Sequence, residues 1–173
     1  MTTARQLPTD DEKRRFMRRA VDLSYIGAFE EKPGTTWPFA AIIVKAGKII
    51  EHVRDTTKYI VTVDPTAHAE VVAIRNTCDS LKTSILSGCD IYTSCEPCNM
   101  CTAAILLAGI ERVYYGATVE KLVEKQYISI SSDLKFEVLV HPRPAEYYNI
   151  REHVDDSKIY EIWQKWSFKQ TIN

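Results

Sequence analysis

Apolar residues recur every three or four positions in two stretches of the chain, and each stretch predicts an amphipathic helix. The first helix is expected to begin at a cap supplied by Thr9 or Asp10 and to run to about Ala28. The second covers residues 157–168, close to the end of the sequence. Residues 1–10 show no such pattern, so we predict a flexible N-terminus there.

Shorter apolar runs between these helices predict strands that alternate with two further helices. Residues 67–78 and 98–108 are longer apolar segments and predict helices. The order strand, strand, helix, strand, helix, strand is typical of a layered α/β fold. We expect a single domain over residues 1–173, with residues 155–173 as a C-terminal helix and tail. The predicted strands are residues 39–44, 49–53, 89–93, 112–116 and, after a less regular stretch, 135–140.

Charge and composition restrict the partners of this domain. A formal net charge of −1 gives no general electrostatic reason to bind nucleic acid or an anionic membrane. The longest apolar run, residues 103–110, is too short to span a bilayer. The N-terminus also lacks the apolar segment of a signal peptide. We therefore expect a cytoplasmic protein, with neither a membrane nor nucleic acid as its partner.

Basic residues cluster on the first predicted helix. We interpret the cluster as a solvated helix face, and an RNA-binding patch is the alternative. The residues are Lys13, Arg14, Arg15, Arg18 and Arg19.

The cysteines point to a metal rather than to disulfides. There are five, an odd number, and three of them fall within seven residues. His68, Cys98 and Cys101 together offer three ligands and leave one position of a tetrahedral Zn²⁺ open for water. Glu70 lies two residues after the histidine, in the same predicted helical turn, and is not needed as a ligand. It is therefore available to move protons.

A closed site is the alternative for these ligands. Cys95 precedes Cys98 by the same gap that separates Cys98 from Cys101, so the spacing alone also fits a structural zinc or an iron–sulfur cluster. Two features argue against both alternatives. Glu70 would have no role, and the ligands lie on separate helices of one apolar core rather than on a small zinc ribbon.

Two segments resemble the cytidine-deaminase-like superfamily and, within it, the guanine deaminase branch. They are DPTAHAEVVAIR at residues 64–75 and YTSCEPCNMC at residues 92–101. The resemblance implies His68, Cys98 and Cys101 as zinc ligands and Glu70 as the general acid/base. It also implies a three-layer α/β/α fold with a mixed five-stranded sheet, and a homodimer. In the guanine deaminase branch the C-terminal segment can be exchanged between subunits, and residues 155–173 are the corresponding part of this chain.

The resemblance is weaker where the substrate would be recognised. Phe39 matches the family residue that packs on the base, whereas Trp37 replaces a glycine and Leu107 a tryptophan. Asp55 stands where the family has an asparagine, and an ionised carboxylate only accepts hydrogen bonds. Trp37 either stacks on the substrate or packs within its loop. Backbone groups near Ala69 and in the 94–97 turn can hold the amino group. The predicted substrate-binding set is Trp37, Phe39, Asp55, Ala69, Ser94, Glu96 and Pro97.

These residues predict a zinc-dependent hydrolase that deaminates a small aminated heterocycle and releases ammonia. A free purine base such as guanine is the first candidate substrate. The alternatives within the enzyme class are a nucleoside, cytosine, a pterin-like ring or an adenosine in tRNA. A zinc-binding subunit without catalytic activity is the alternative from another class.

Overall fold

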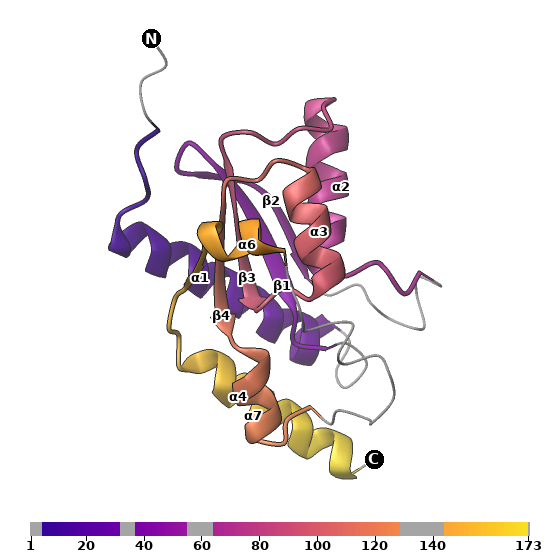
Figure 1. The fold of residues 1–173 in the computed structure, drawn as a ribbon. Helices are drawn as coiled ribbons and strands as arrows, with labels where there is room; N and C mark the ends of the chain where they lie inside the picture. Colours follow the sequence, from indigo (N-terminus) through magenta and orange to yellow (C-terminus); the bar gives the residue numbers. More distant parts are fainter. Residues whose placement is uncertain (1–4, 32–36, 55–63, 129–143, 173) are drawn as a thin grey trace.

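The computed structural model describes residues 5–31, 37–54, 64–128 and 144–172 (Figure 1). The four predicted strands before residue 120 and the four predicted helices are present, with ends shifted by a few residues. The predicted strand at 135–140 lies outside the described residues, and the fifth strand is a short segment after residue 150. The helices are α1 (Asp10–Tyr25), its π-helical continuation η1 (Ile26–Glu31), α2 (Ala69–Leu81), α3 (Asn99–Leu107), α4 (Val119–Glu124), α6 (Ala145–Ile150) and α7 (Lys158–Ile172). The strands are β1 (Ala40–Lys45), β2 (Lys48–Arg54), β3 (Cys89–Cys95), β4 (Arg112–Ala117) and β5 (Arg151–His153).

The five strands form one mixed sheet in the order β2-β1-β3-β4-β5. β1 pairs antiparallel with both β2 and β3, whereas β4 pairs parallel with both β3 and β5. The β1–β2 hairpin turns at Ala46 and Gly47, whose φ angles are 49° and 73°. Positive φ at both central residues is the geometry that matches the twist of a two-residue hairpin. The mixed five-stranded sheet that the resemblance implied is thus confirmed.

Helices cover both faces of this sheet, which makes the molecule a three-layer α/β/α structure as predicted (Figure 1). Alternate residues of β1 divide between the two cores, because successive side chains of a strand point to opposite faces. Ala40 and Ile42 pack with residues of α1 and α7. Ala41 and Ile43 pack with residues of α2 and α3. Apart from Lys45 every residue of β1 is buried, as its continuous apolar run predicted.

The N-terminal segment is anchored more firmly than its sequence suggested. Thr9 caps α1 in a capping box: its hydroxyl accepts from the Glu12 N–H at 3.3 Å, and the Glu12 carboxylate accepts from the Thr9 N–H at 2.9 Å. Arg5 reaches the sheet and forms ion pairs with Asp90 at 2.6 Å and Glu111 at 2.8 Å. Arg5 is thus held by two ion pairs, residues 1–4 lie outside the described residues, and the flexibility of residues 1–10 stays a prediction.

The C-terminal helix α7 packs on α1 and on the start of β1 in the same chain. Trp163 has no exposed surface, and its ring lies edge-on to Phe39 with centroids 5.2 Å apart. Trp166 lies against Trp37, with ring centroids 4.4 Å apart. The exchange of residues 155–173 between two subunits stays a prediction.

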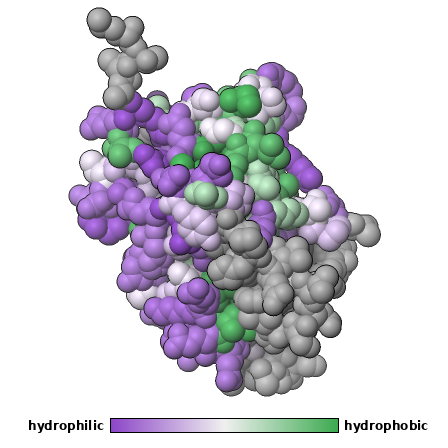
Figure 2. All heavy atoms as spheres, in the orientation of Figure 1, coloured by the Kyte–Doolittle hydropathy of each residue, from purple (hydrophilic) through white to green (hydrophobic). Residues whose placement is uncertain are grey.

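Apolar side chains gather over α2 and α3 on the face shown in Figure 2, whereas the surface along α1 is mostly hydrophilic. Large exposed hydrophobic residues in this region are Leu81 and Leu107, which end α2 and α3, and Ile85, which follows α2. The predicted homodimer stays a prediction. Within the part of the chain that the structure describes, no helix combines the length and apolar character that crossing a membrane requires.

Candidate metal centre

The first predicted ligand lies at the start of α2. His68 is the N-cap of this helix, and its side chain makes no capping hydrogen bond. The turn before it is held by Asp64, whose carboxylate accepts from the Thr66 N–H at 2.8 Å and from Arg75 on α2 at 3.1 Å. The imidazole is therefore presented at the helix end by a turn that is tied back to the same helix.

The two predicted cysteine ligands lie at the start of α3. Cys98 is the N-cap and Cys101 is the third helical residue, and the Cys98 side chain makes no capping bond either. The chain enters this helix from β3 through Glu96, whose N–H donates to the Ala117 carbonyl of β4 at 2.8 Å. Both ligand-bearing helices thus begin at the site. Their first N–H groups have no intrahelical acceptors, and the positive ends of their dipoles favour thiolates there.

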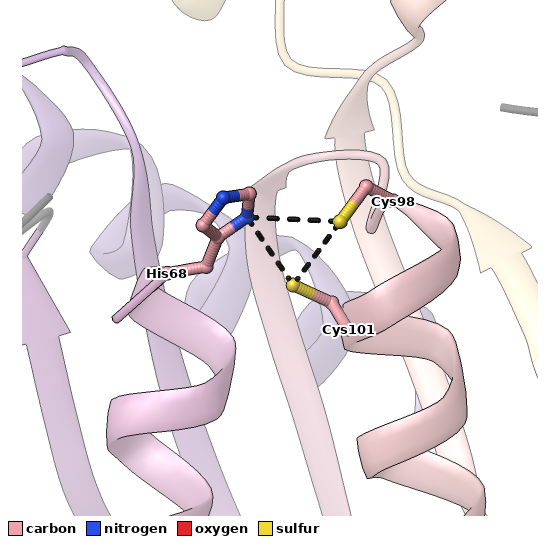
Figure 3. Close-up of side chains that lie close together, drawn as sticks. All are labelled: His68, Cys98 and Cys101. Carbon is pink, nitrogen blue, oxygen red and sulfur yellow. Dashed lines mark hydrogen bonds between the residues drawn. The ribbon is translucent and has the colours of Figure 1, made fainter. Parts of the chain in front are cut away.

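The three ligand atoms converge closely (Figure 3). The two Sγ atoms are 3.6 Å apart, and His68 Nδ1 lies 3.6 Å from Cys98 Sγ and 3.5 Å from Cys101 Sγ. A tetrahedral Zn²⁺ with bonds of about 2.3 Å to sulfur and about 2.0 Å to nitrogen would separate its ligands by about 3.8 Å (S···S) and about 3.5 Å (S···N). The observed triangle therefore fits a zinc ion without rearrangement.

The ionisation of the two thiols also fits a cation. The Cys101 thiol and the His68 imidazole beside it lower the pKa of Cys98 to about 4. The neighbouring Cys98 sulfur and burial raise the pKa of Cys101 well above its usual value. The pair by itself therefore holds one thiolate easily and resists the second. A divalent cation removes that resistance, because a coordinating thiol is deprotonated outright.

Glu70 is buried beside this triangle but does not join it. It is the second residue of α2, and the group of converging ligand atoms in the described residues contains no carboxylate. Burial, followed by the charge of the Cys98 thiolate, raises the pKa of the Glu70 carboxyl to about 7. The structure thus brings together the three predicted ligands and the predicted acid/base, which stays outside the ligand set.

Cys95 lies away from the metal centre. It packs in the core between the sheet and α1, together with Tyr92 and Ala117. Among the described His, Cys, Asp and Glu side chains, it does not belong to the converging group. The geometry therefore leaves the fourth position without a described protein ligand and disfavours a closed structural site.

Two of the predicted substrate residues, Trp37 and Phe39, lie where β1 begins. Their rings stack with centroids 6.3 Å apart and an interplanar angle of 23°, and both are half-buried. Trp37 also contacts Trp166, so it packs against α7 while retaining an exposed part. Both rings pack against the core that α1 and α7 share with the sheet. Packing within the protein is thus observed for Trp37, and its stacking on a substrate stays a prediction.

The other predicted substrate residues divide into backbone groups and engaged side chains. Ala69 is the first residue of α2, so its N–H has no intrahelical acceptor. The Ser94 hydroxyl accepts from the Ala40 N–H at 2.9 Å, which leaves its carbonyl as the group to consider. Pro97 is buried directly before Cys98. Asp55 lies outside the described residues. Leu107 is 81% exposed at the end of α3 and lies on the surface.

Glu96 is engaged with a residue that the sequence did not single out. Its carboxylate accepts from Arg151 Nη1 at 2.5 Å, and 8% of its side chain is exposed. The two residues are 55 positions apart, and Arg151 belongs to a strand that no sequence pattern predicted. No local signal in the sequence connects them.

The chain belongs to a deaminase family. The sequence profile of the cytidine and deoxycytidylate deaminase zinc-binding region matches residues 10–117, which include all three predicted metal ligands and Glu70. This match and the ligand triangle agree on Zn²⁺ as the cofactor. The members are hydrolases that act on carbon–nitrogen bonds, and this chain shares their metal-binding region.

Relatives with two different substrates resemble this chain. Guanine deaminase from Bacillus subtilis is 34% identical over 157 residues, which are 90% of this chain and 96% of that protein. The tRNA-specific adenosine deaminase from Aquifex aeolicus is 39% identical over 115 residues, which are 66% of this chain and 74% of that protein. The X-ray structure of the Bacillus subtilis guanine deaminase matches with a TM-score of 0.59 at 32% identity and covers 88% of this chain and 93% of its own. The cytidine-deaminase-like fold is confirmed.

Proposed function

We propose that this protein is a zinc-dependent deaminase of a small free heterocycle, with guanine as the first substrate to test. The observation that carries this choice is the extent of the similarity to the Bacillus subtilis guanine deaminase. That similarity spans 90% of the chain, whereas the more identical tRNA deaminase from Aquifex aeolicus spans 66%.

The reaction exchanges an amino group for an oxygen. A water oxygen bonds to the ring carbon that carries the amino group, the carbon–nitrogen bond breaks, and ammonia leaves. Glu70 takes one proton from the attacking water and delivers it to the ring nitrogen. It then takes the proton that remains on the added hydroxyl and delivers it to the departing amino group, so the ring carbon keeps the oxygen as a carbonyl. Its place in the first turn of α2, beside the ligands but not among them, supports this role.

The other groups hold the metal and the ring. His68, Cys98 and Cys101 would bind Zn²⁺. The ion would lower the pKa of a water molecule, so that a hydroxide nucleophile is available at neutral pH. Phe39 and Trp37 offer flat apolar surfaces for a planar ring. The Ala69 N–H and the carbonyls of the 94–97 turn are the groups assigned to orient the amino substituent. Asp55 is assigned to accept a hydrogen bond from the ring edge.

Deamination of an adenosine in tRNA is the second candidate, because the Aquifex aeolicus relative is 39% identical. The surface of α1 gives little support to it. Lys13 pairs with Glu152 at 2.8 Å, and Arg18 pairs with Asp156 at 2.6 Å. Arg14 pairs with Asp11 on the same helix. Partnered basic side chains have less excess charge to offer to phosphates.

The test is ammonia release by purified protein of known zinc content from guanine, cytosine, adenine, isocytosine, pterin, guanosine and cytidine. Inosine formation in adenosine-containing tRNA is measured in parallel. We expect turnover of guanine. The Glu70→Gln variant should retain zinc and lose about 10²–10⁴-fold in turnover, the range for a general acid/base. Glu120→Gln, on the exposed side of α4, is the matched control and should retain turnover.

The other outcomes are equally clear. Inosine formation in tRNA without turnover of any free base would replace this proposal with the second candidate. Turnover of another ring, with guanine inert, would keep the deaminase and point to Asp55 and Trp37 as the residues that select the substrate. Full zinc content with no turnover at all would favour the catalytically silent subunit.

A further inference from the structure

We propose that Arg151 is a positioning residue for the metal centre, acting through Glu96 on the turn that carries Cys98. This proposal rests on the metal site and does not depend on which substrate the protein deaminates. Arg151 opens β5 and lies outside the residues 10–117 that the family profile matches.

The ion pair between these residues is close and largely shielded from water. Arg151 Nη1 donates to Glu96 Oε1 at 2.5 Å, and the exposed fractions of the two side chains are 28% and 8%. Screening by water weakens such a pair less than an exposed one. Removing the arginine would leave a carboxylate that is nearly buried and has lost this partner.

Aromatic rings hold the guanidinium in one orientation. Its central carbon lies 4.6 Å from the ring centroid of Tyr148, 5.8 Å from Tyr147 and 5.9 Å from Tyr115. A planar guanidinium stacks on such rings and keeps its donors in a fixed fork, which a lysine ammonium does not do. The side chain is therefore already ordered when it meets Glu96, so little conformational entropy is lost.

The link from Arg151 to the metal is short. Glu96 is two residues before Cys98, and the buried Pro97 stands between them. The Glu96 N–H is bonded to the Ala117 carbonyl of β4, so the backbone of the turn is held by one strand and its side chain by the next. Proline restricts the backbone of its own position and of the residue before it. A carboxylate fixed at Glu96 therefore restricts where the Cys98 sulfur can lie.

The turn before His68 provides a contrast. Its ion pair between Asp64 and Arg75 joins residues 11 positions apart, and the two side chains are 42% and 56% exposed. Exposed pairs of this kind contribute little. The histidine turn is thus supported locally, whereas the cysteine turn depends on a contact with a distant strand.

The test measures metal binding and geometry, not turnover. Zinc affinity is determined by competition with a chromophoric chelator for the wild type, Arg151→Ala, Arg151→Lys and Glu96→Gln. Loss of a residue that orients a metal ligand typically costs 10–100-fold in affinity. We expect the zinc Kd of Arg151→Ala and Glu96→Gln to rise by about 10-fold or more, with Arg151→Lys in between. The double variant Arg151→Ala/Glu96→Gln should bind zinc no more weakly than the weaker-binding of the two single variants, since both substitutions remove the same contact.

Substitution with Co²⁺ adds a geometric readout, because its absorption bands report the coordination geometry. We expect shifted or weakened bands in Arg151→Ala at saturating metal. Glu152→Gln is the matched control: it removes an ion pair of the same strand, to Lys13 on α1, that does not reach the turn. Its zinc Kd and cobalt spectrum should equal those of the wild type.

The proposal is wrong if folded Arg151→Ala binds zinc as tightly as the wild type with an unchanged cobalt spectrum. It is also wrong if Glu152→Gln weakens zinc equally, since general loosening of β5 would then be the cause. Arg151→Lys and Glu96→Gln decide the question if Arg151→Ala does not fold. An inactive wild type with this pattern of zinc affinities would contradict the proposed reaction alone.

Discussion

Cys95, Cys98 and Cys101 show how much a single residue's position depends on the strand or helix that carries it. All three are separated by the same two-residue gaps, so the spacing does not distinguish a ligand from a core residue. Cys98 and Cys101 lie at the start of α3 and face His68. Cys95 ends β3 and packs against α1 on the other side of the sheet.

This difference makes a matched pair of substitutions informative. We expect Cys101→Ser to lose stoichiometric zinc, because a hydroxyl does not replace a thiolate as a zinc ligand. Cys95→Ser should retain one zinc per chain and cost some stability, since it places a hydroxyl in an apolar core. Metal analysis after gel filtration measures both. If Cys95→Ser folds normally but loses its zinc, Cys95 is a fourth ligand and the site is a closed structural one.

At the scale of the element, the starts of α1, α2 and α3 differ in the groups that are found there. α2 and α3 begin at the predicted metal ligands His68 and Cys98, and neither side chain makes a capping hydrogen bond. The segment before α1 is anchored by Arg5, which pairs with the buried Asp90 of β3. Burial raises the pKa of the Asp90 carboxyl, and Arg5 opposes that rise.

Removing this anchor should have an effect that depends on pH. We expect Arg5→Ala to lower the free energy of unfolding at pH 7 by about 1–3 kcal/mol, because a nearly buried carboxylate loses its partner. The folded-state pKa of Asp90 lies above its usual value and should rise further in the variant. A neutral carboxyl needs no cation, so the loss relative to the wild type should shrink as the pH falls through that raised pKa.

Chemical denaturation at several pH values measures this difference. Arg14→Ala is the control. The side chains of Arg14 and its partner Asp11 are 65% and 92% exposed, so the loss of this pair should change the free energy of unfolding little at any pH. A loss for Arg5→Ala that is the same at every pH would exclude the Asp90 carboxylate as its cause.

At the scale of the whole molecule, the metal centre connects segments that the chain keeps apart. α2 and α3 lie side by side on one face of the sheet, and their first turns meet at the ligands (Figure 1). On the other face, α7 packs on α1 and β4, and its apolar residues share one core with residues of β1. A bound ion at the junction of two helices stabilises only the state in which both are in place.

Removal of zinc should therefore lower the melting temperature. A ligand that binds only the folded state adds RT ln(1 + [L]/Kd), or about 4 kcal/mol when the free ligand exceeds Kd by a factor of about 1,000. We expect a chelator to lower the Tm of the wild type by several degrees and added zinc to restore it. Cys101→Ser should melt at the same temperature with or without chelator. If the chelator leaves the Tm of the wild type unchanged, the site does not bind zinc tightly.

The order of the elements and the identity of the chemical groups could be predicted from the sequence alone. Apolar periodicity located α1, α2, α3 and α7, and it located four strands, because helices and strands bury side chains with different periods. His68, Glu70, Cys98 and Cys101 were identifiable because zinc and proton transfer need those side-chain types. The resemblance, rather than periodicity, implied the mixed sheet.

Other features were decided by the tertiary structure, because they depend on contacts between residues distant in sequence. The three-residue β5 is too short for a periodic pattern and exists through its pairing with β4. The Arg151–Glu96 and Arg5–Asp90 pairs join residues 55 and 85 positions apart. The spacing of Cys95 suits a ligand, yet the sheet turns it into the opposite core. Local sequence determined which groups are present, and the packing of the layers decided which of them meet.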